Sequence, residues 1–278
     1  MTYVFVWDSA DVLRDILPYF AFFRCVYWAS YLSTYFVRGY DGLKPGEKSL
    51  WGSAWCSSIL SVWMPYLVLQ VGADNGGKML LFNYPYTFRD DRVVHMALIM
   101  AGYFSADLIP CMQHRGGWGK DWSVFALHHT AALWYFGSCI YFELGHGTLM
   151  TVCMVELSNA FNNNRMFISK AQVADGRSIA KAYPLVNVLN GVVFTLSFFV
   201  TRVIGFPFIG WWTLLENRTE LLTYPLMFQV SLHFNFIIGV SMQFYWFDKI
   251  ARGMYSLLTK SDKGKGVSGD DKMQSKNK

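Results

Sequence analysis

The chain consists of long apolar runs separated by short polar stretches. Seven such runs can be drawn, at about 16–37, 51–71, 93–112, 122–142, 148–167, 183–206 and 221–247. Each run is close to the roughly 20 residues that an α-helix needs to cross the hydrocarbon core of a bilayer. The pattern therefore predicts an all-α polytopic membrane protein with seven transmembrane helices and no separate soluble domain.

The fourth and fifth runs are divided only by the pentapeptide ELGHG at 143–147. The distribution of basic residues decides between six and seven spans. With seven spans, seventeen Lys and Arg residues fall on the side of the C-terminus and five on the other side. Merging the two runs would place the basic stretch 165–181 opposite the Lys-rich tail. Because basic residues collect on the cytosolic side, we predict seven spans, an extracytosolic turn at ELGHG and a cytosolic C-terminus.

Three regions follow from this arrangement. We expect residues 1–50 to hold an extracytosolic N-terminus, the first transmembrane helix and a cytosolic loop, and residues 51–247 to hold six further helices. Residues 248–278 form a basic tail with too few apolar residues to fold, which predicts disorder. The first residues lack a basic segment and a small-residue cleavage site, so we expect no cleaved signal peptide. Asn217 begins an N-glycosylation sequon on the predicted extracytosolic side, and its occupancy stays open.

Composition excludes several classes of function. The chain is 53% hydrophobic and only 15% charged, and its net charge of +5 comes largely from lysines in the tail. Such a tail is typical of the cytosolic side of a membrane and does not indicate a nucleic-acid partner. The five cysteines lie in or at the ends of apolar runs without C-x-x-C spacing, so they predict neither disulfides nor metal ligands. Histidines spaced i,i+4 are absent as well, and we expect no metal site.

Polar residues occur inside the apolar runs, at depths that follow from the helical rise of about 1.5 Å per residue. Most fall in the predicted cytosolic half, and a few reach the middle of the membrane. This placement predicts a polar cavity that opens toward the cytosol and ends near the midplane. The predicted cavity residues are Asp107, Glu156, Ser158, Asn163, Asn190 and His233, together with His128 and His129.

Structural roles compete with function at several of these positions. Ser158, Asn159 and Asn187 are of the types that hydrogen-bond between membrane helices. Arg24 and Arg202 lie toward the extracytosolic ends of their runs, where snorkelling or ion pairing accounts for a basic residue.

The adjacent histidines are a stronger sign of function. His128 and His129 point about 100° apart around a helix, so at least one of them supports the other. Asp107 and Glu156, like these histidines, have no partner nearby in the sequence, which makes all four candidates for function.

Four separated motifs carry a resemblance to a known family. They are AGYFSADLI, LHHTAALWYF, MVELSNAFNNNRMF and LNGVVFTLSFFVTRV, in this order within 51–247. The chain resembles the TLC-domain family, and in particular its small TLC-domain-containing members rather than the ceramide synthases. The resemblance implies that the six helices of 51–247 form a TLC domain around a lipid-accessible cavity, preceded by one extra helix.

The resemblance leaves two functions open. Ceramide synthases join a sphingoid base to the acyl group of an acyl-CoA, and their His pair is followed by a His-Asp pair and a further Asp. In this chain Met154, Val155 and Ser158 stand at those later positions. The small-protein subgroup carries instead the residues that this chain keeps at Glu156, Leu157, Ser158, Phe161, Asn163 and Arg165.

We therefore favour a protein that handles or regulates membrane lipids, and with them lipid homeostasis and membrane composition, without a cofactor. The alternative is a ceramide-synthase-like N-acyltransferase in which His128 or His129 acts as general base and acyl-CoA is a co-substrate. A seven-span receptor or channel explains fewer of these residues. The expected partners are membrane lipids, including sphingoid bases or fatty acyl groups, and a homodimer stays open. A location in the endoplasmic reticulum follows only from the family.

Overall fold

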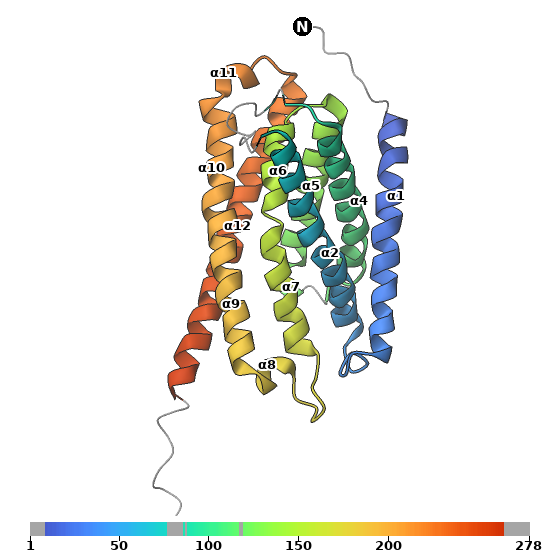
Figure 1. The fold of residues 1–278 in the computed structure, drawn as a ribbon, viewed down its shortest axis with the longest axis vertical. Helices are drawn as coiled ribbons and strands as arrows, with labels where there is room; N and C mark the ends of the chain where they lie inside the picture. Colours follow the sequence, from blue (N-terminus) through green and yellow to red (C-terminus); the bar gives the residue numbers. More distant parts are fainter. Residues whose placement is uncertain (1–8, 77–85, 87, 117–118, 264–278) are drawn as a thin grey trace, which may run out of the picture.

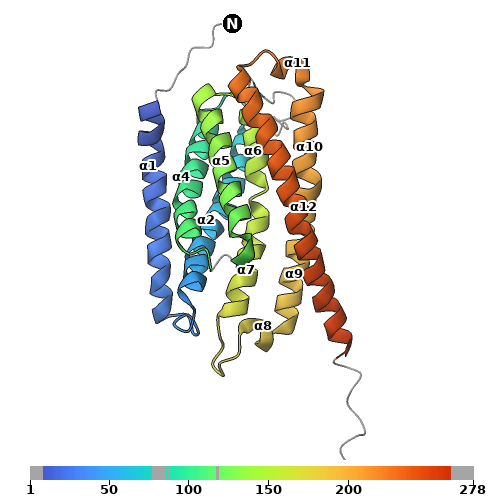
Figure 2. The same ribbon diagram turned by 180° about the vertical axis from the view of Figure 1, so that it is seen from behind.

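The computed structural model describes residues 9–76, 86, 88–116 and 119–263, and Figure 1 shows their arrangement. Apart from one isolated bridge between Gln172 and Ser178, the regular structure in these residues is helical. The long helices run up and down along the long axis of the molecule (Figures 1 and 2). The predicted all-α class is confirmed.

Local signals set the starts of the first helices. Pro45 opens the second long helix, where its missing N–H group costs nothing. The carboxylate of Asp90 accepts a hydrogen bond from the backbone nitrogen of Arg92 at 2.9 Å and thereby caps the third. The first long helix is α1 (Ser9–Ala29), which a 3₁₀ turn (Ser30–Tyr35) follows. The second long helix is α2 (Pro45–Asp74), and the third is α4 (Asp91–Gln113).

A tight turn separates the next two helices. A 3₁₀ turn (Gly119–Asp121) leads into α5 (Trp122–Phe142), and α6 (His146–Met154) follows. Between α5 and α6, Glu143 and Gly145 adopt positive φ angles of 50° and 75°, which reverse the chain. The short ELGHG connector is therefore a turn between two helices in the structure.

The chain tightens where α6 passes into α7 (Leu157–Lys170). The backbone nitrogen of Val155 donates to the carbonyl of Val152 at 3.2 Å, and that of Glu156 donates to Cys153 at 3.3 Å. These bonds join residues three apart, as in a 3₁₀-helix, and such a stretch between two α-helices often marks a functional position. Glu156 lies at this tightened turn.

The following helices widen instead of tightening. After the short α8 (Ile179–Ala182) and α9 (Pro184–Phe198), the chain forms a π-helix at Phe199–Gly205, continues as α10 (Phe206–Trp211), and forms a second π-helix at Trp212–Glu216. A π-helix has more residues per turn than an α-helix, so it rotates the side chains within it. Arg202 lies in the first π-helix. The short α11 (Arg218–Leu221) and the long α12 (Leu226–Lys263) complete the fold.

Packing places α7 inside the bundle. Helix α1 packs on α4, α4 on α5, and α12 on α5, while α7 packs on both α2 and α9. As a result α1 lies at one side of the molecule and α9, α10 and α12 lie at the other (Figures 1 and 2). The fully buried apolar side chains of the core include Phe23, Leu60, Met100, Phe136 and Phe228.

The outer surface of the bundle is apolar. Leu17, Leu69, Leu185 and Ile237 each expose 60% or more of their surface. Among the described residues, three helical stretches combine the length and apolar composition needed to cross a membrane: Pro45–Asp74, Asp91–Gln113 and Pro184–Glu216. Both features suit an environment of lipid chains.

The predicted tail differs from the structure in its first half. We expected disorder from residue 248, but α12 continues to Lys263. Arg252 pairs with Asp248 one turn earlier at 2.9 Å, and Lys249 forms an ion pair with Asp121. Apolar side chains contribute as well, because Ile250 lines the wide cavity and the methyl group of Met254 lies next to Gly191 of α9. The remainder of the tail, 264–278, and Lys78 lie outside the described residues.

Candidate lipid cavity

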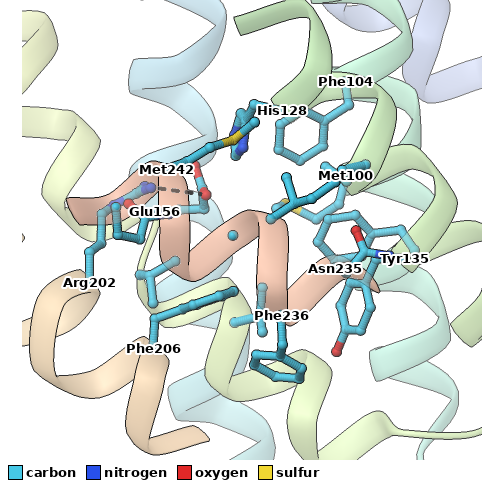
Figure 3. Close-up of a pocket in the computed structure, with 18 residues that line it drawn as sticks. Met100, Phe104, His128, Tyr135, Glu156, Arg202, Phe206, Asn235, Phe236 and Met242 are labelled. Carbon is cyan, nitrogen blue, oxygen red and sulfur yellow. Dashed lines mark ion pairs between the residues drawn. The ribbon is translucent and has the colours of Figure 1, made fainter. Parts of the chain in front are cut away.

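Two internal spaces lie side by side within the bundle. The wide cavity has a volume of about 770 Å³ and is lined by residues of α2, α4, α5, α7, α9 and α12. It extends to Ala180 in α8 and to Ser256 near the end of α12. The narrow chamber has a volume of about 60 Å³. Its walls are mostly apolar, and Met100, Phe206, Phe236 and Met242 are among the residues that surround it in Figure 3.

Four residues line both spaces, and we call them the collar: Phe104, His128, Glu156 and Arg202. They come from α4, α5, the α6–α7 turn and the first π-helix. The collar therefore brings together an aromatic ring, an imidazole and an ion pair where the wide cavity, which holds most of the polar lining groups, meets the mostly apolar chamber.

Arg202 and Glu156 are held in a small polar network. Nη2 of Arg202 lies 3.5 Å from Oε1 of Glu156 and donates to Oδ1 of Asn159 at 3.1 Å, while Nε donates to Oγ of Ser158 at 2.8 Å. Nδ2 of Asn159 in turn donates to Oε2 of Glu156 at 2.7 Å. Both charged side chains are almost fully buried. Figure 3 shows the pair at one side of the narrow chamber. The two charges compensate each other inside the bundle.

The sequence did not predict that Arg202 belongs to the site. Its position near the end of an apolar run predicts only snorkelling or ion pairing, and the structure shows an ion pair with Glu156, which lies 46 positions earlier. The π-helix at Phe199–Gly205 turns this arginine toward α7. The available signal was a basic residue inside the apolar stretch LNGVVFTLSFFVTRV, because a charge in such a run needs a partner.

Asp107 and His129 form a second buried pair. Nε2 of His129 lies 2.9 Å from Oδ2 of Asp107, and Nδ1 lies 2.7 Å from the carbonyl oxygen of Phe125 one turn earlier in α5. A carbonyl only accepts hydrogen bonds, so Nδ1 carries a proton. Both ring nitrogens of His129 are therefore engaged, and this histidine is fixed in the wall of the wide cavity.

His128 differs from its neighbour. Its ring packs edge-on against Phe104 and Trp246, with ring centres 5.5 and 5.3 Å apart. Within the described part of the chain His128 makes no hydrogen bond to another residue. Of the two histidines, His128 is the one whose nitrogens can bind a molecule that enters the cavities.

Of the other predicted cavity residues, Asn163 lines the wide cavity, whereas Ser158 and Asn190 do not. Asn163 is buried and lines the wide cavity, and its Nδ2 has no hydrogen-bond partner among the described residues. Ser158 lies behind the wall, where it donates to the carbonyl of Val155 at 2.9 Å and accepts from Arg202. Asn190 does not line either space, because its Nδ2 donates to the carbonyl of Phe161 at 3.0 Å and joins α9 to α7.

His233 lies outside both spaces, contrary to its predicted place in the lining. Its side chain is exposed on the same outer face of α12 as Val230 and Ile237, and its Nδ1 is 2.8 Å from the carbonyl of Gln229. The position of His233 along the helix axis predicts a cavity residue, but this position does not determine which face of the helix points inward. Among the described residues no three His, Cys, Asp or Glu side chains are grouped closely enough to hold a metal ion.

Comparison with known proteins identifies the family. A sequence model of the TLC domain matches residues 47–252, which covers most of the chain and all residues that line the two spaces except Gly253 and Ser256. The chain belongs to the TLC-domain family. Curated relatives include TLC domain-containing protein 4-B of Xenopus laevis, 26% identical over 243 residues (84% of this chain and 85% of that protein). The protein of the same name from Danio rerio is 27% identical over 259 residues (88% of each). No solved structure matches the chain.

The TLC domain places its motifs together in space. The AGYFSADLI motif supplies Phe104 and Asp107, the LHHTAALWYF motif His128 and His129, and the two later motifs Glu156 and Arg202. Motifs that span about a hundred residues of sequence thus meet around two adjoining spaces.

Proposed function

We propose that this TLC-domain protein spans the membrane seven times and binds a membrane lipid in the two connected spaces, through which it handles or regulates membrane lipids. One observation carries the proposal. A wide cavity with polar side chains in a largely apolar wall meets a narrow apolar chamber at the collar of Phe104, His128, Glu156 and Arg202. A cavity lined mainly by apolar groups, with a few polar groups at one position, is the usual form of a site for an amphiphilic ligand.

The chemistry of the two spaces supports a lipid over a small polar metabolite. Methylene groups placed in the narrow chamber gain roughly 0.8 kcal/mol each on leaving water. His128 lies next to the chamber with both nitrogens available, so it can donate to or accept from an ester, amide or hydroxyl group of the lipid.

The test uses a substitution that fills the chamber. Ala132 lines the narrow chamber, whereas Val230 lies on the exposed outer face of α12, so Ala132→Phe and Val230→Phe form a matched pair. The proteins are purified in a neutral detergent, and their bound lipids are extracted and quantified by mass spectrometry. We expect stoichiometric lipid on the wild type and on Val230→Phe and clearly less on Ala132→Phe. Bound lipid at the level of the detergent background in the wild type contradicts the proposal.

The proposed orientation places α8 and the C-terminal end of α12 on the cytosolic side, so that the wide cavity opens toward the cytosol. The proposed membrane is that of the endoplasmic reticulum. The orientation rests on the excess of basic residues at that end of the bundle. A tag after residue 278 should be digested by protease added to intact microsomes. A protected tag would reverse the orientation.

A second candidate is the N-acyltransferase, which joins a sphingoid base to an acyl-CoA. The observation in its favour is the position of His128, which makes no hydrogen bond to another described residue and lies at the meeting point of the two spaces. Against it, Val155 is a buried wall residue of the narrow chamber and Met154 precedes it, where the ceramide synthases carry His and Asp. We expect the purified protein to form no ceramide from acyl-CoA. Activity that is lost in His128→Ala would establish the enzyme instead.

A further inference from the structure

The charges that line the wide cavity do not all have partners. Asp107 pairs with His129, Glu156 pairs with Arg202, and Lys249 pairs with Asp121. Arg165 also lines this cavity, but it forms no ion pair or hydrogen bond with another described residue. When the paired charges are set aside, one positive charge remains in the wall.

The guanidinium of Arg165 reaches from α7 across to α12. Its Nη2 lies 3.8 Å from the position that a Cβ atom would take at Gly253, which also lines the wide cavity. A glycine at this point leaves the space next to the guanidinium open. Ala180 and Ser256 line the same end of the cavity, so Arg165 belongs to its mouth near α8.

Other hydrogen-bond donors share this wall. Asn162 and Asn187, from α7 and α9, line the wide cavity without a side-chain hydrogen bond to another described residue. Nδ2 of Asn163 is likewise without a partner in that part of the chain, although its side chain is only 6% exposed. A guanidinium with several amide N–H groups calls for a ligand that has negative charge and many acceptor oxygens. A phosphate group meets both conditions, because its oxygens accept paired hydrogen bonds from the planar guanidinium.

We propose that the mouth of the wide cavity binds the phosphate of a phosphate-bearing lipid through Arg165, with the apolar part of the lipid directed toward the collar. This assignment rests on the proposed lipid-binding function and names the chemical class of the ligand. No bond is made or broken in this step.

The experiment measures binding of three probes to the full-length protein in a neutral detergent, by native mass spectrometry. Dioleoyl phosphatidic acid has both phosphate and chains, dioleoylglycerol has the same chains without the phosphate, and inorganic phosphate has no chains. The variant is Arg165→Gln. Its matched control is Arg177→Gln, because Arg177 lies two residues before α8 and is exposed like Arg165, but pairs with Asp175 at 2.7 Å and does not line the cavity.

We expect the wild type and Arg177→Gln to prefer phosphatidic acid over dioleoylglycerol. Arg165→Gln should weaken phosphatidic acid binding about tenfold, which corresponds to 1.4 kcal/mol, and leave dioleoylglycerol binding unchanged. Unchanged dioleoylglycerol binding also shows that the variant is folded.

Four outcomes overturn the assignment. Equal binding of phosphatidic acid and dioleoylglycerol by the wild type, or equal losses in the two arginine variants, removes the phosphate site but leaves the lipid-binding function standing. Inorganic phosphate that binds as tightly as phosphatidic acid shows a site for a free anion instead of a lipid. If neither lipid binds to the wild type, the proposed function fails together with this inference.

Discussion

The two buried acid–base pairs in the cavity wall are held by different kinds of backbone. Asp107 and His129 lie on two regular helices, α4 and α5, that pack directly against each other. Glu156 and Arg202 lie where helices depart from regular geometry, at the tightened turn between α6 and α7 and in a π-helix. Regular packing is enough to fix a pair in the wall. Bringing a pair to the junction of two spaces required both helices to be distorted.

The two pairs also differ in what surrounds them. His129 has a carboxylate on one nitrogen and a carbonyl on the other, and it touches only the wide cavity. Arg202 is bound to three side chains and still borders both spaces. The comparison indicates a supporting role for the first pair and places the second pair at the border of both spaces.

The largest effect is expected from breaking the pair at the collar. Arg202→Met leaves the carboxylate of Glu156 buried without its positive partner, and such a loss typically costs about 3–5 kcal/mol. The double variant with Glu156→Gln removes both charges and should recover a good part of this free energy. Equilibrium unfolding in mixed micelles measures both variants. A double variant as unstable as Arg202→Met alone would show that the pair is not the source of the loss.

The adjacent histidines should differ in their contribution to stability. His129→Leu removes two hydrogen bonds and leaves Asp107 without a partner, and we expect a loss of roughly 2–3 kcal/mol. His128→Leu removes ring contacts but no hydrogen bond to a described residue, so it should lower stability by less than about 1 kcal/mol. Instead, it should reduce the amount of bound lipid. The same unfolding assay and lipid extraction serve here, and equal losses in the two variants would contradict the division of roles.

The smallest effect concerns an ion pair outside the membrane-spanning helices. The hydrogen bond from Lys249, and a second from Tyr245, lower the pKa of Asp121 below its ordinary value. A lowered pKa stabilises the folded state above the pKa of the unfolded chain, and this contribution disappears as the pH falls through the folded value. Asp121→Asn should therefore lower Tm slightly at pH 7. Thermal unfolding should show that the gap to the wild type closes below about pH 4. A gap that is constant with pH would mean that the charge of Asp121 is not responsible.

Sequence patterns predicted the helical class and the polar stripe of α7, because apolar run length and helical periodicity depend only on local sequence. Asp107, Glu156 and Asn163 accordingly line the wide cavity. The partner of Glu156 was not predictable from periodicity, because the π-helix around Arg202 changes the angle between successive side chains. His233 shows the converse case. Its helix is regular, but the pattern of α12 does not reveal which face meets the bundle.

The length of α12 joins the cavity mechanically to the region beyond the membrane. Its 38 residues make a rod about 57 Å long, whereas the hydrocarbon core of a bilayer measures about 30 Å. Met242 and Trp246 contact the internal spaces near the middle of this rod, and Lys249 ties it to the start of α5. A change in the tilt of α12 at the spaces would therefore be carried to Lys263, about 26 Å beyond Trp246. The helix has the form of a lever with one arm of about 30 Å before Trp246 and a second arm of about 26 Å after it.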